Sequence, residues 1–213
     1  MITHLLFDLD NTLYSARYGL EDNVSRRIND FLVNTLGMRL EDALKARAEV
    51  FNKYGTTLEW LMVEKGFTDV ELYFKHVCPA DEAESLPPDL DLGMILDSIP
   101  VPKAILTNSP AEHADRILNK LGIKTSFTRI FDIRFNKFKG KPRRDAFFRA
   151  LDAMNAKPET TLFIDDNPNF AEGFIALGGK ALLLDEFDAH TELSISRIKN
   201  IREISNLTLK DEV

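Results

Sequence analysis

Seven polar residues of the sequence combine the types that could bind a metal ion and a phosphate group. They are Asp8, Asp10, Thr107, Asn108, Lys141, Asp165 and Asp166. Clustered carboxylates repel one another and resist ionisation unless a cation compensates for their charge. Oxygen ligands favour Mg²⁺, whereas zinc or copper sites usually include His or Cys, so these carboxylates indicate a magnesium site.

The segment Thr107-Asn108 is a candidate phosphate-binding turn, because it follows an apolar run and precedes a helical pattern. The N-terminus of a helix offers free N–H groups and a partial positive charge, both of which attract phosphate. Lys141 precedes another helical pattern and would add a full positive charge. We therefore expect a phosphate group to bind between these residues.

Proline marks the expected starts of three helices. They begin at Pro110, Pro142 and Pro168. Ser109 and Glu112 have the spacing of a capping box, and Asn167 is a typical N-cap residue. Because capping explains Ser109 and Asn167 fully, we expect no further role for either residue.

Five short apolar runs predict buried strands, at residues 5–7, 104–106, 130–133, 162–164 and 181–184. Helical patterns separate the last four, and one of them stops at Gly122, a typical helix C-cap. Alternating buried strands and amphipathic helices indicate an α/β fold with a Rossmann-like parallel sheet and helices on both faces. Ligands of such sheets bind beyond the carboxyl ends of the strands, which is where most of the seven polar residues occur.

The interval between the first two strands is too long for a single crossover helix and has helical patterns throughout. They cover about residues 20–36, 40–54, 57–65 and 69–77. We predict an inserted helical subdomain at residues 16–88, which ends at the breaker Leu86-Pro87-Pro88. Residues 1–15 and 89–213 would form the core domain.

The composition excludes several classes of partner. The net charge of -7 disfavours a nucleic acid polymer, and no apolar run approaches the roughly 20 residues of a membrane helix. The single Cys78 cannot form an internal disulfide, and the N-terminus has no basic region or cleavage signature. We therefore expect a cytoplasmic protein that binds no membrane and forms a monomer or a weak homodimer.

Two further groups of residues are expected to be structural. The histidines show no ligand spacing; they are His4, His76, His113 and His190. A basic stretch spans residues 134–144, and a solvated loop face accounts for most of its six cations.

The order of the polar motifs resembles that of the haloacid dehalogenase superfamily. Its four motifs match here as Asp8-Leu9-Asp10-Asn11-Thr12, Thr107-Asn108, Lys141-Pro142 and Asp165-Asp166. The insertion at residues 16–88 is similar to the small helical cap of that superfamily. A narrower resemblance to the pyrimidine 5'-nucleotidase branch rests on Asp8 to Tyr14 with Gly19-Leu20, on His113-Ala114 after Thr107-Asn108, and on Asn169 after Asp166.

The resemblance implies a Mg²⁺-dependent phosphomonoester hydrolase that acts through an aspartyl-phosphate intermediate. Asp8 would be the nucleophile, and Asp10 would protonate the leaving group and then activate water. Lys141 would neutralise charge on the transferred phosphoryl group and, with Thr107 and Asn108, bind the phosphate.

The resemblance also implies the ligands of the metal. The side chains of Asp8 and Asp166 and the backbone carbonyl of Asp10 would bind Mg²⁺. Asp165 would lie in the ligand shell or directly behind it.

The expected substrate is a small phosphorylated metabolite, with a pyrimidine nucleoside 5'-monophosphate as one candidate. Aromatic residues of the insertion could stack on a base, and Tyr14 and Tyr18 are the first candidates because they are nearest to Asp8 in sequence. The others are Phe51, Tyr54 and Trp60.

Several alternatives remain. A phosphomutase or a sugar-phosphate phosphatase would use the same residues. Asp10 and the pair Asp165-Asp166 argue against a haloacid dehalogenase, because expelling a halide requires neither a proton on the leaving group nor a phosphate-bound metal. A non-catalytic sensor of a phosphorylated ligand is disfavoured because every catalytic motif residue is present.

Overall fold

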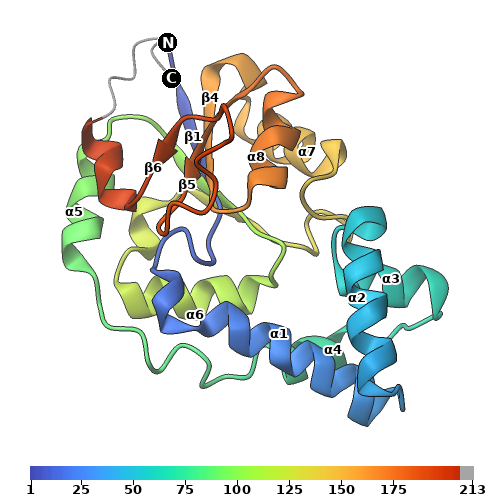
Figure 1. Cartoon of the computed structure of the whole chain (residues 1–213). Helices are drawn as coiled ribbons and strands as arrows, with labels where there is room; N and C mark the ends of the chain where they lie inside the picture. The colour runs from blue at the N-terminus through green and yellow to red at the C-terminus, as the bar shows by residue number, and fades with distance from the viewer. Residues whose placement is uncertain (207–213) are drawn as a thin grey trace.

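A computed structural model of the chain describes residues 1–206, and the side chains of residues 51, 52 and 206 lie outside this description. Its centre is a parallel sheet with the strand order β3-β2-β1-β4-β5-β6 (Figure 1). The strands are β1 (His4–Phe7), β2 (Lys103–Leu106), β3 (Arg129–Phe131), β4 (Thr161–Asp165), β5 (Lys180–Leu184) and β6 (Arg197–Ile198). The predicted α/β fold with a Rossmann-like sheet is confirmed.

Helices cover both faces of the sheet. They are α5 (Leu90–Ser98), α6 (Ala111–Leu121), α7 (Arg144–Met154) and α8 (Pro168–Ile175). Successive side chains of a strand point to opposite faces. Leu5 and Phe7 of β1 belong to the same core cluster as residues of α5 and α6, whereas Leu6 packs in the cluster that includes α7 and α8.

The register of the central strands fixes which residues meet beyond their ends. In the β1–β4 pair Phe7 lies opposite Ile164, so the next residues, Asp8 and Asp165, lie side by side. The backbone N–H of Asp8 donates to the carbonyl of Ile164 over 2.8 Å. In the β1–β2 pair Phe7 lies opposite Ile105, which brings the segment after β2 to the same edge.

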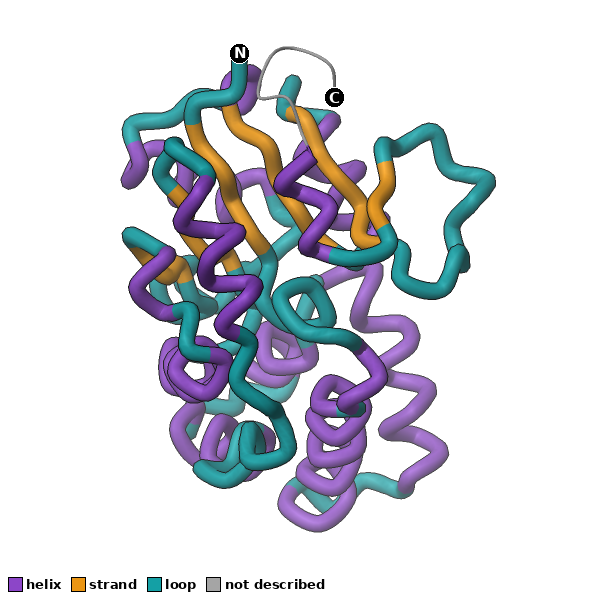
Figure 2. The backbone as a smooth tube through the Cα atoms, turned by 90° about the vertical axis from the view of Figure 1, so that its left-hand side faces the viewer, coloured by secondary structure: helices purple, strands orange, loops and turns teal. Residues whose placement is uncertain are grey.

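The long interval after β1 is helical, as predicted. Its helices are α1 (Leu20–Asp30), α2 (Leu40–Tyr54), α3 (Thr57–Glu64) and α4 (Val70–Val77), with a π-helical turn, η2 (Phe31–Thr35), after α1. They share a hydrophobic cluster of their own, which includes Phe31, Leu61 and Phe74. Figure 2 shows a group of helices beyond one end of the strands, and Figure 1 identifies it as α1 to α4. The proposed subdomain boundaries at residues 16 and 88 stay a prediction.

Short 3-10 segments complete the described elements. They are η1 (Ala16–Tyr18), η3 (Lys124–Ser126), η4 (Pro158–Thr160) and η5 (Ile201–Asn206). Ile198, Ile201 and Ile204 are buried in the core. Over residues 1–206, no helix combines the length and apolar character needed to span a bilayer.

Helix starts differ partly from the prediction. Asn167 is the N-cap of α8, where its side chain accepts from the N–H of Asn169, and Pro168 is the first residue of that helix, as predicted. By contrast, α7 begins at Arg144, two residues after Pro142, and α6 begins at Ala111 with Pro110 as its N-cap. Proline alone therefore located only one of the three starts.

Candidate active site

The seven predicted polar residues converge at the carboxyl ends of β1, β2 and β4. Six of them line a cavity of about 480 Å³ between this edge and the helices α1, α2 and α4; they are Asp8, Asp10, Thr107, Asn108, Lys141 and Asp166. Asp165 is fully buried and contacts Lys141. The motifs are far apart in the sequence, but their residues thus form one compact group in the structure.

Lys141 is fully buried between two carboxylates. Its Nζ lies 2.5 Å from Asp8 Oδ1 and 2.6 Å from Asp165 Oδ2. Burial opposes the charge of the ammonium group, but the two carboxylates outweigh it and raise the pKa of Lys141. The lysine is therefore a fixed positive charge at the base of the cavity.

The side chain of Asn108 holds the backbone of Lys141. Its Oδ1 accepts from the N–H of Lys141 over 2.7 Å, and its Nδ2 donates to the carbonyl of Lys141 over 3.0 Å. Gly140 allows this approach, because a Cβ at that position would lie only 2.0 Å from Asn108 Oδ1. The sequence predicted a phosphate contact for Asn108, and the structure adds a positioning contact with Lys141.

Three acidic residues form a group that could hold a metal ion. One carboxylate oxygen from each of Asp8, Asp165 and Asp166 lies within 4.8 Å of the others. Burial, followed by the negative charges of Asp8 and Glu21, raises the pKa of Asp166 to about 8. Burial likewise raises the pKa of Asp8, and Lys141 offsets this only in part. A set made of oxygen donors with excess negative charge fits a hard divalent cation.

Thr12 fixes the position of Asp166. The hydroxyl of Thr12 accepts from the N–H of Asp166 over 3.1 Å and lies 3.4 Å from its Oδ1. Thr12 belongs to the segment after β1 and is itself buried. The two strand ends are thereby tied together beside the group of three carboxylates.

Asp10 lies in a different environment from Asp8. Its Oδ1 is 2.5 Å from the Tyr14 hydroxyl and 2.7 Å from His113 Nε2, and its Oδ2 accepts from Ser109 Oγ over 3.0 Å. Burial opposes ionisation of Asp10, but His113 and the other donors outweigh it and lower the pKa of the carboxyl group. The two carboxylates of the first motif are therefore held by different partners.

The predicted capping box at Ser109 and Glu112 is wrong. Pro110 is the N-cap of α6, so Ser109 lies one residue too early for its hydroxyl to cap the helix. The hydroxyl donates to Asp10 instead, because a buried carboxylate is a strong acceptor. Glu112 forms an ion pair with Arg134 at 2.8 Å.

His113 was expected to be a purely structural histidine, and its contact with the site was missed. The side chain is fully buried, with Nε2 on Asp10 and Nδ1 2.9 Å from Glu82 Oε1. Burial opposes its charge, but Asp10, followed by Cys78 and Glu82, outweighs it and holds the pKa of His113 well above its usual range. Its position in the first turn of the helix after Thr107 was the signal that could have indicated this contact.

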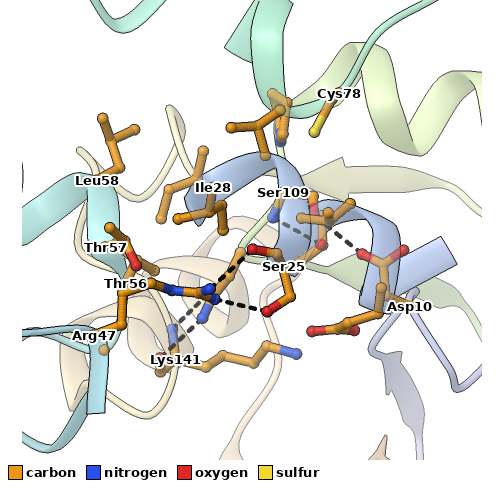
Figure 3. A pocket seen from close by; sticks show the side chains of 18 of the residues that line it. Asp10, Ser25, Ile28, Arg47, Thr56, Thr57, Leu58, Cys78, Ser109 and Lys141 are labelled. Carbon is orange, nitrogen blue, oxygen red and sulfur yellow. Dashed lines mark hydrogen bonds between the residues drawn. The ribbon is translucent and has the colours of Figure 1, made fainter. Parts of the chain in front are cut away.

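Helices α1, α2 and α4 form the other wall of the cavity. Arg47 of α2 lies in this wall, where its guanidinium donates to the backbone carbonyl and the hydroxyl of Ser25 over 2.9 and 3.0 Å (Figure 3). Glu21 of α1 also lines the cavity, and burial together with the charges of Asp10 and Asp8 raises its pKa to about 8. Apolar side chains such as Ile28 and Leu58 complete the wall.

The aromatic residues of this wall are not the ones that the sequence suggested. Tyr73 and Phe74 of α4 line the cavity, whereas Tyr14 is buried against Asp10. Tyr18 lines a separate cavity of about 170 Å³, because it precedes α1 and faces away from the site. Trp60 and Tyr54 pack in the cluster of the inserted helices, and the side chain of Phe51 lies outside the description.

Half of the basic stretch is structural rather than solvated. Lys141 is buried, Arg134 pairs with Glu71 of α4 at 2.8 Å, and Arg143 pairs with Glu59 of α3 at 2.7 Å. The remaining cations are exposed, as expected; they are Lys137, Lys139 and Arg144. The two arginines link the core to the inserted helices beside the cavity.

Comparison with known proteins places this arrangement in context. The family model for haloacid dehalogenase-like hydrolases matches residues 2–178. Phosphate metabolism protein 8 of Saccharomyces cerevisiae is 25% identical over 218 residues, which cover 94% of this chain and 68% of the yeast protein.

Solved structures show the same fold at lower identity. A HAD phosphatase from Thermococcus onnurineus has a TM-score of 0.64 at 16% identity and covers 96% of this chain and 97% of its own. L-2-haloacid dehalogenase from Xanthobacter autotrophicus has a TM-score of 0.62 at 17% identity over the whole of both chains. β-Phosphoglucomutase from Clostridium difficile has a TM-score of 0.62 at 17% identity and covers 96% of this chain and 93% of its own.

Proposed function

Because the chain belongs to the haloacid dehalogenase-like hydrolases, we propose that it is a Mg²⁺-dependent phosphomonoester hydrolase that acts through a phosphorylated Asp8. The observation that carries the proposal is the position of Lys141. Its ammonium group lies between Asp8 and Asp165 at the base of the cavity, next to a carboxylate that can attack phosphorus. A fixed cation there would stabilise the charge of a transferred phosphoryl group.

The two carboxylates of the first motif would divide the reaction between them. Asp8 attacks phosphorus, and the bond from phosphorus to the leaving oxygen breaks while Asp10 gives that oxygen a proton. Asp10 then takes a proton from water, whose oxygen attacks phosphorus and releases phosphate and the Asp8 carboxylate. The three donors around Asp10 favour its ionised form, and the negative charge of a bound phosphate would favour its protonation for the first step.

The metal would be held by the carboxylates of Asp8 and Asp166 and the backbone carbonyl of Asp10. Asp165 would support this shell, since Lys141 and the N–H of Asn167 hold its two oxygens at 2.6 and 2.8 Å. Bound Mg²⁺ would neutralise charge on the phosphate oxygens. Thr107 and Asn108 would bind the same phosphate from the end of β2.

Magnesium is expected to stabilise the protein more at high pH than at low pH. Asp166 has a pKa of about 8 in the folded protein and an ordinary value of 3.8, so the folded state binds its proton more tightly. The resulting stability is full below the ordinary value and is lost as the pH rises toward about 8. Without magnesium, the melting temperature should therefore fall between about pH 5 and pH 8.

Thermal unfolding with and without magnesium tests this expectation. A saturating concentration should raise the melting temperature by about 5–10 °C near pH 8 and by much less near pH 5. Sodium chloride at matched ionic strength is the control, and Asp166→Asn should remove most of the magnesium effect. A shift of equal size at both pH values would argue against binding through these carboxylates.

Gly140→Ala is expected to lower turnover about 10- to 100-fold through Lys141. The added Cβ would meet Asn108 Oδ1 at 2.0 Å and displace the side chain that holds both backbone groups of Lys141. Phosphate release under saturating substrate measures the effect. Gly93→Ala in α5 is the matched control, because its nearest contact is 3.6 Å away; equal losses in the two variants would refute this account of Gly140.

Two observations favour a phosphatase over a dehalogenase. The carboxyl group of Asp10 can serve as an acid only when the leaving group needs a proton. A halide leaving group needs none. Asp165 and Asp166 add negative charge, which a metal and a phosphate group use and which would repel a haloacid carboxylate. A phosphomutase would use the same residues and differ only in passing the phosphoryl group to a second substrate hydroxyl.

A small phosphorylated metabolite is the proposed substrate, and the helices within residues 16–88 are the proposed cap that selects it. A cavity of about 480 Å³ has the size of a small-molecule site. Tyr73 and Phe74 in its wall could stack on a base, which keeps a pyrimidine nucleoside 5'-monophosphate among the candidates. The name of the yeast relative refers to phosphate metabolism, which agrees with a phosphorylated substrate.

The proposed function is tested by phosphate release from p-nitrophenyl phosphate, with magnesium and with a chelator. We expect release that requires magnesium, and no release of chloride from 2-chloropropionate. A panel of pyrimidine and purine 5'-monophosphates, sugar phosphates and phosphoglycolate then ranks the substrates. Chloride release without phosphatase activity would refute the proposal, and a low rank for every pyrimidine nucleotide would remove the nucleotidase assignment.

A further inference from the structure

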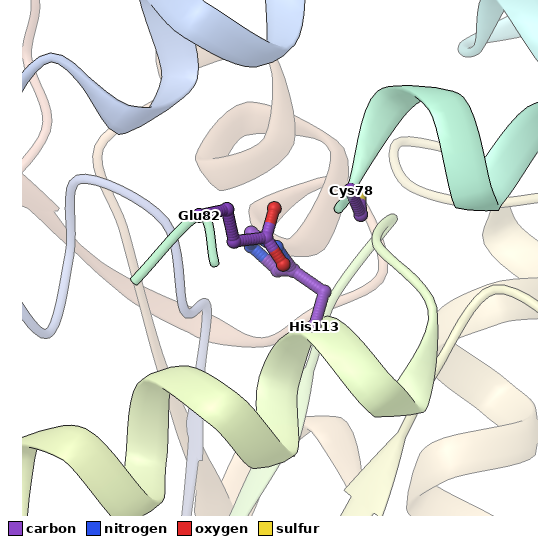
Figure 4. A group of neighbouring side chains, drawn as sticks. All are labelled: Cys78, Glu82 and His113. Atoms are coloured by element: carbon purple, nitrogen blue, oxygen red, sulfur yellow. The ribbon is translucent and has the colours of Figure 1, made fainter. Parts of the chain in front are cut away.

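A buried group of side chains at the edge of the cavity meets the proposed reaction only through Asp10. It consists of Cys78, which follows α4, Glu82 in the connection between α4 and α5, and His113 of α6 (Figure 4). The carboxylate of Glu82 lies against the imidazole of His113, with Cys78 close by. The side chains of Glu82 and His113 are only 2% and 1% exposed.

We propose that His113 is a positioning residue that orients Asp10 for acid–base work, and that Glu82 in turn fixes the imidazole of His113. The inference rests on the proposed function, because it assigns Asp10 the role of acid and base. It adds two residues, His113 at the side chain of Asp10 and Glu82 behind it.

The first step of the argument is the contact with Asp10. His113 Nε2 and the Tyr14 hydroxyl meet Oδ1 of Asp10 at 2.7 and 2.5 Å, while Ser109 holds Oδ2 at 3.0 Å. Partners on both oxygens leave the carboxylate little freedom to rotate. A general base must present one lone pair to its water, so this fixed orientation matters for rate.

The second step is the far side of the imidazole. Nδ1 lies 2.9 Å from Glu82 Oε1, and the same oxygen accepts from Arg116 Nε over 2.9 Å. Arg116 also donates to the carbonyl of Cys78 over 2.9 Å. The imidazole is enclosed between the carboxylates of Asp10 and Glu82, so turning the ring would break the contact of Nε2 with Asp10.

The third step is the place of Glu82 in the chain. It lies in the connection that returns from the inserted helices to the core, and Glu82 Oε2 is 3.9 Å from Arg27 Nη1 of α1. The orientation of Asp10 is thereby linked to the return segment of the insertion. Two arginines on Glu82 also explain why we assign positioning, and not metal binding, to this group: their positive charge would repel a cation.

The His113→Leu variant tests the proposal, with p-nitrophenyl phosphate as substrate. We expect His113→Leu to lower kcat about 10- to 100-fold and to change KM less than about threefold. In an Asp10→Asn background, His113→Leu should lower kcat further by at most about twofold, because a residue that acts only through Asp10 has no carboxylate left to orient.

Pre-steady-state kinetics gives a readout that a packing defect would not produce. Nitrophenolate is a good leaving group that needs no proton, whereas the second step still needs the base. His113→Leu and Asp10→Asn should therefore both show a burst of nitrophenolate close to the enzyme concentration before slow turnover.

Two conservative variants keep the test valid if the His113→Leu variant does not fold. His113→Gln retains an N–H group and should recover most of the lost kcat, and Glu82→Gln should lower kcat about 3- to 10-fold. His4→Leu, in β1 and away from Asp10, is the control and should leave kcat unchanged.

The outcomes separate this inference from the proposed function. Equal losses in the wild-type and Asp10→Asn backgrounds, or no burst in His113→Leu, would overturn the positioning role while leaving the phosphatase intact. Bound zinc in the purified protein that disappears in His113→Leu would also overturn it, in favour of a metal site. A wild type without turnover would refute the proposed function itself.

Discussion

Replacing Asp8 by Asn is expected to lower phosphate release from p-nitrophenyl phosphate by about 10⁴-fold or more. The amide keeps the shape of the side chain but cannot attack phosphorus. Burial raises the pKa of Asp8, so removing this carboxylate also removes a buried group that resists ionisation. Lys141 keeps Asp165 as a partner, so the variant should still fold. A melting temperature close to that of the wild type would show that the loss of activity reflects chemistry.

Asp185→Asn is the matched control for Asp8→Asn. Asp185 also follows a strand, β5, and is buried, but it accepts from the N–H groups of Ala189 and His190 at 2.7 and 3.1 Å. Its replacement should cost stability and leave kcat unchanged. Undiminished turnover in Asp8→Asn would exclude Asp8 as the nucleophile.

Replacing Lys141 by Met should lower turnover about 10³-fold, because the site loses its buried positive charge. Lys141→Arg should not restore activity, since the planar guanidinium fork needs more room than one ammonium nitrogen between Asp8 and Asp165. Steady-state kinetics with saturating magnesium measures both variants.

The Lys141→Met variant should also be less stable than the wild type when magnesium is absent. Asp8 and Asp165 would keep their buried charges and lose their partner, and breaking a buried ion pair on one side costs about 3–5 kcal/mol. Urea unfolding should show this loss near pH 8 and a smaller one near pH 5, where protonation relieves the repulsion. Lys139→Met, two residues away and exposed, is the control, and an equal loss of activity in that variant would refute the special role of Lys141.

Much of the fold could be predicted because its central strands are buried on both faces. Apolar runs identified β1, β2, β4 and β5, and helical spacing with Gly122 located α6. The helix α5 and the two-residue strand β6 were missed. The helix α5 packs on the sheet and β6 pairs with β5, and short local patterns record neither contact.

Most of the site residues could be predicted because they follow strands in a fixed order. Their partners could not, because these contacts join distant segments. His113 is 103 residues from Asp10, and Asn108 is 33 residues from Lys141. The contact of Ser109 could not be predicted for the same reason. Its spacing from Glu112 suggested a helix cap, but its hydroxyl donates to Asp10, which lies at the end of another strand.

The proposed phosphorylation of Asp8 is tested most directly in the Asp10→Asn variant. Without the base, the intermediate formed from p-nitrophenyl phosphate should accumulate, and an acid quench followed by peptide mapping should find it. We predict close to one phosphoryl group per chain, on the peptide that contains Asp8, released by hydroxylamine as expected for an acyl phosphate. Turnover with no phosphorylated peptide, or with the phosphoryl group on another residue, would contradict the account.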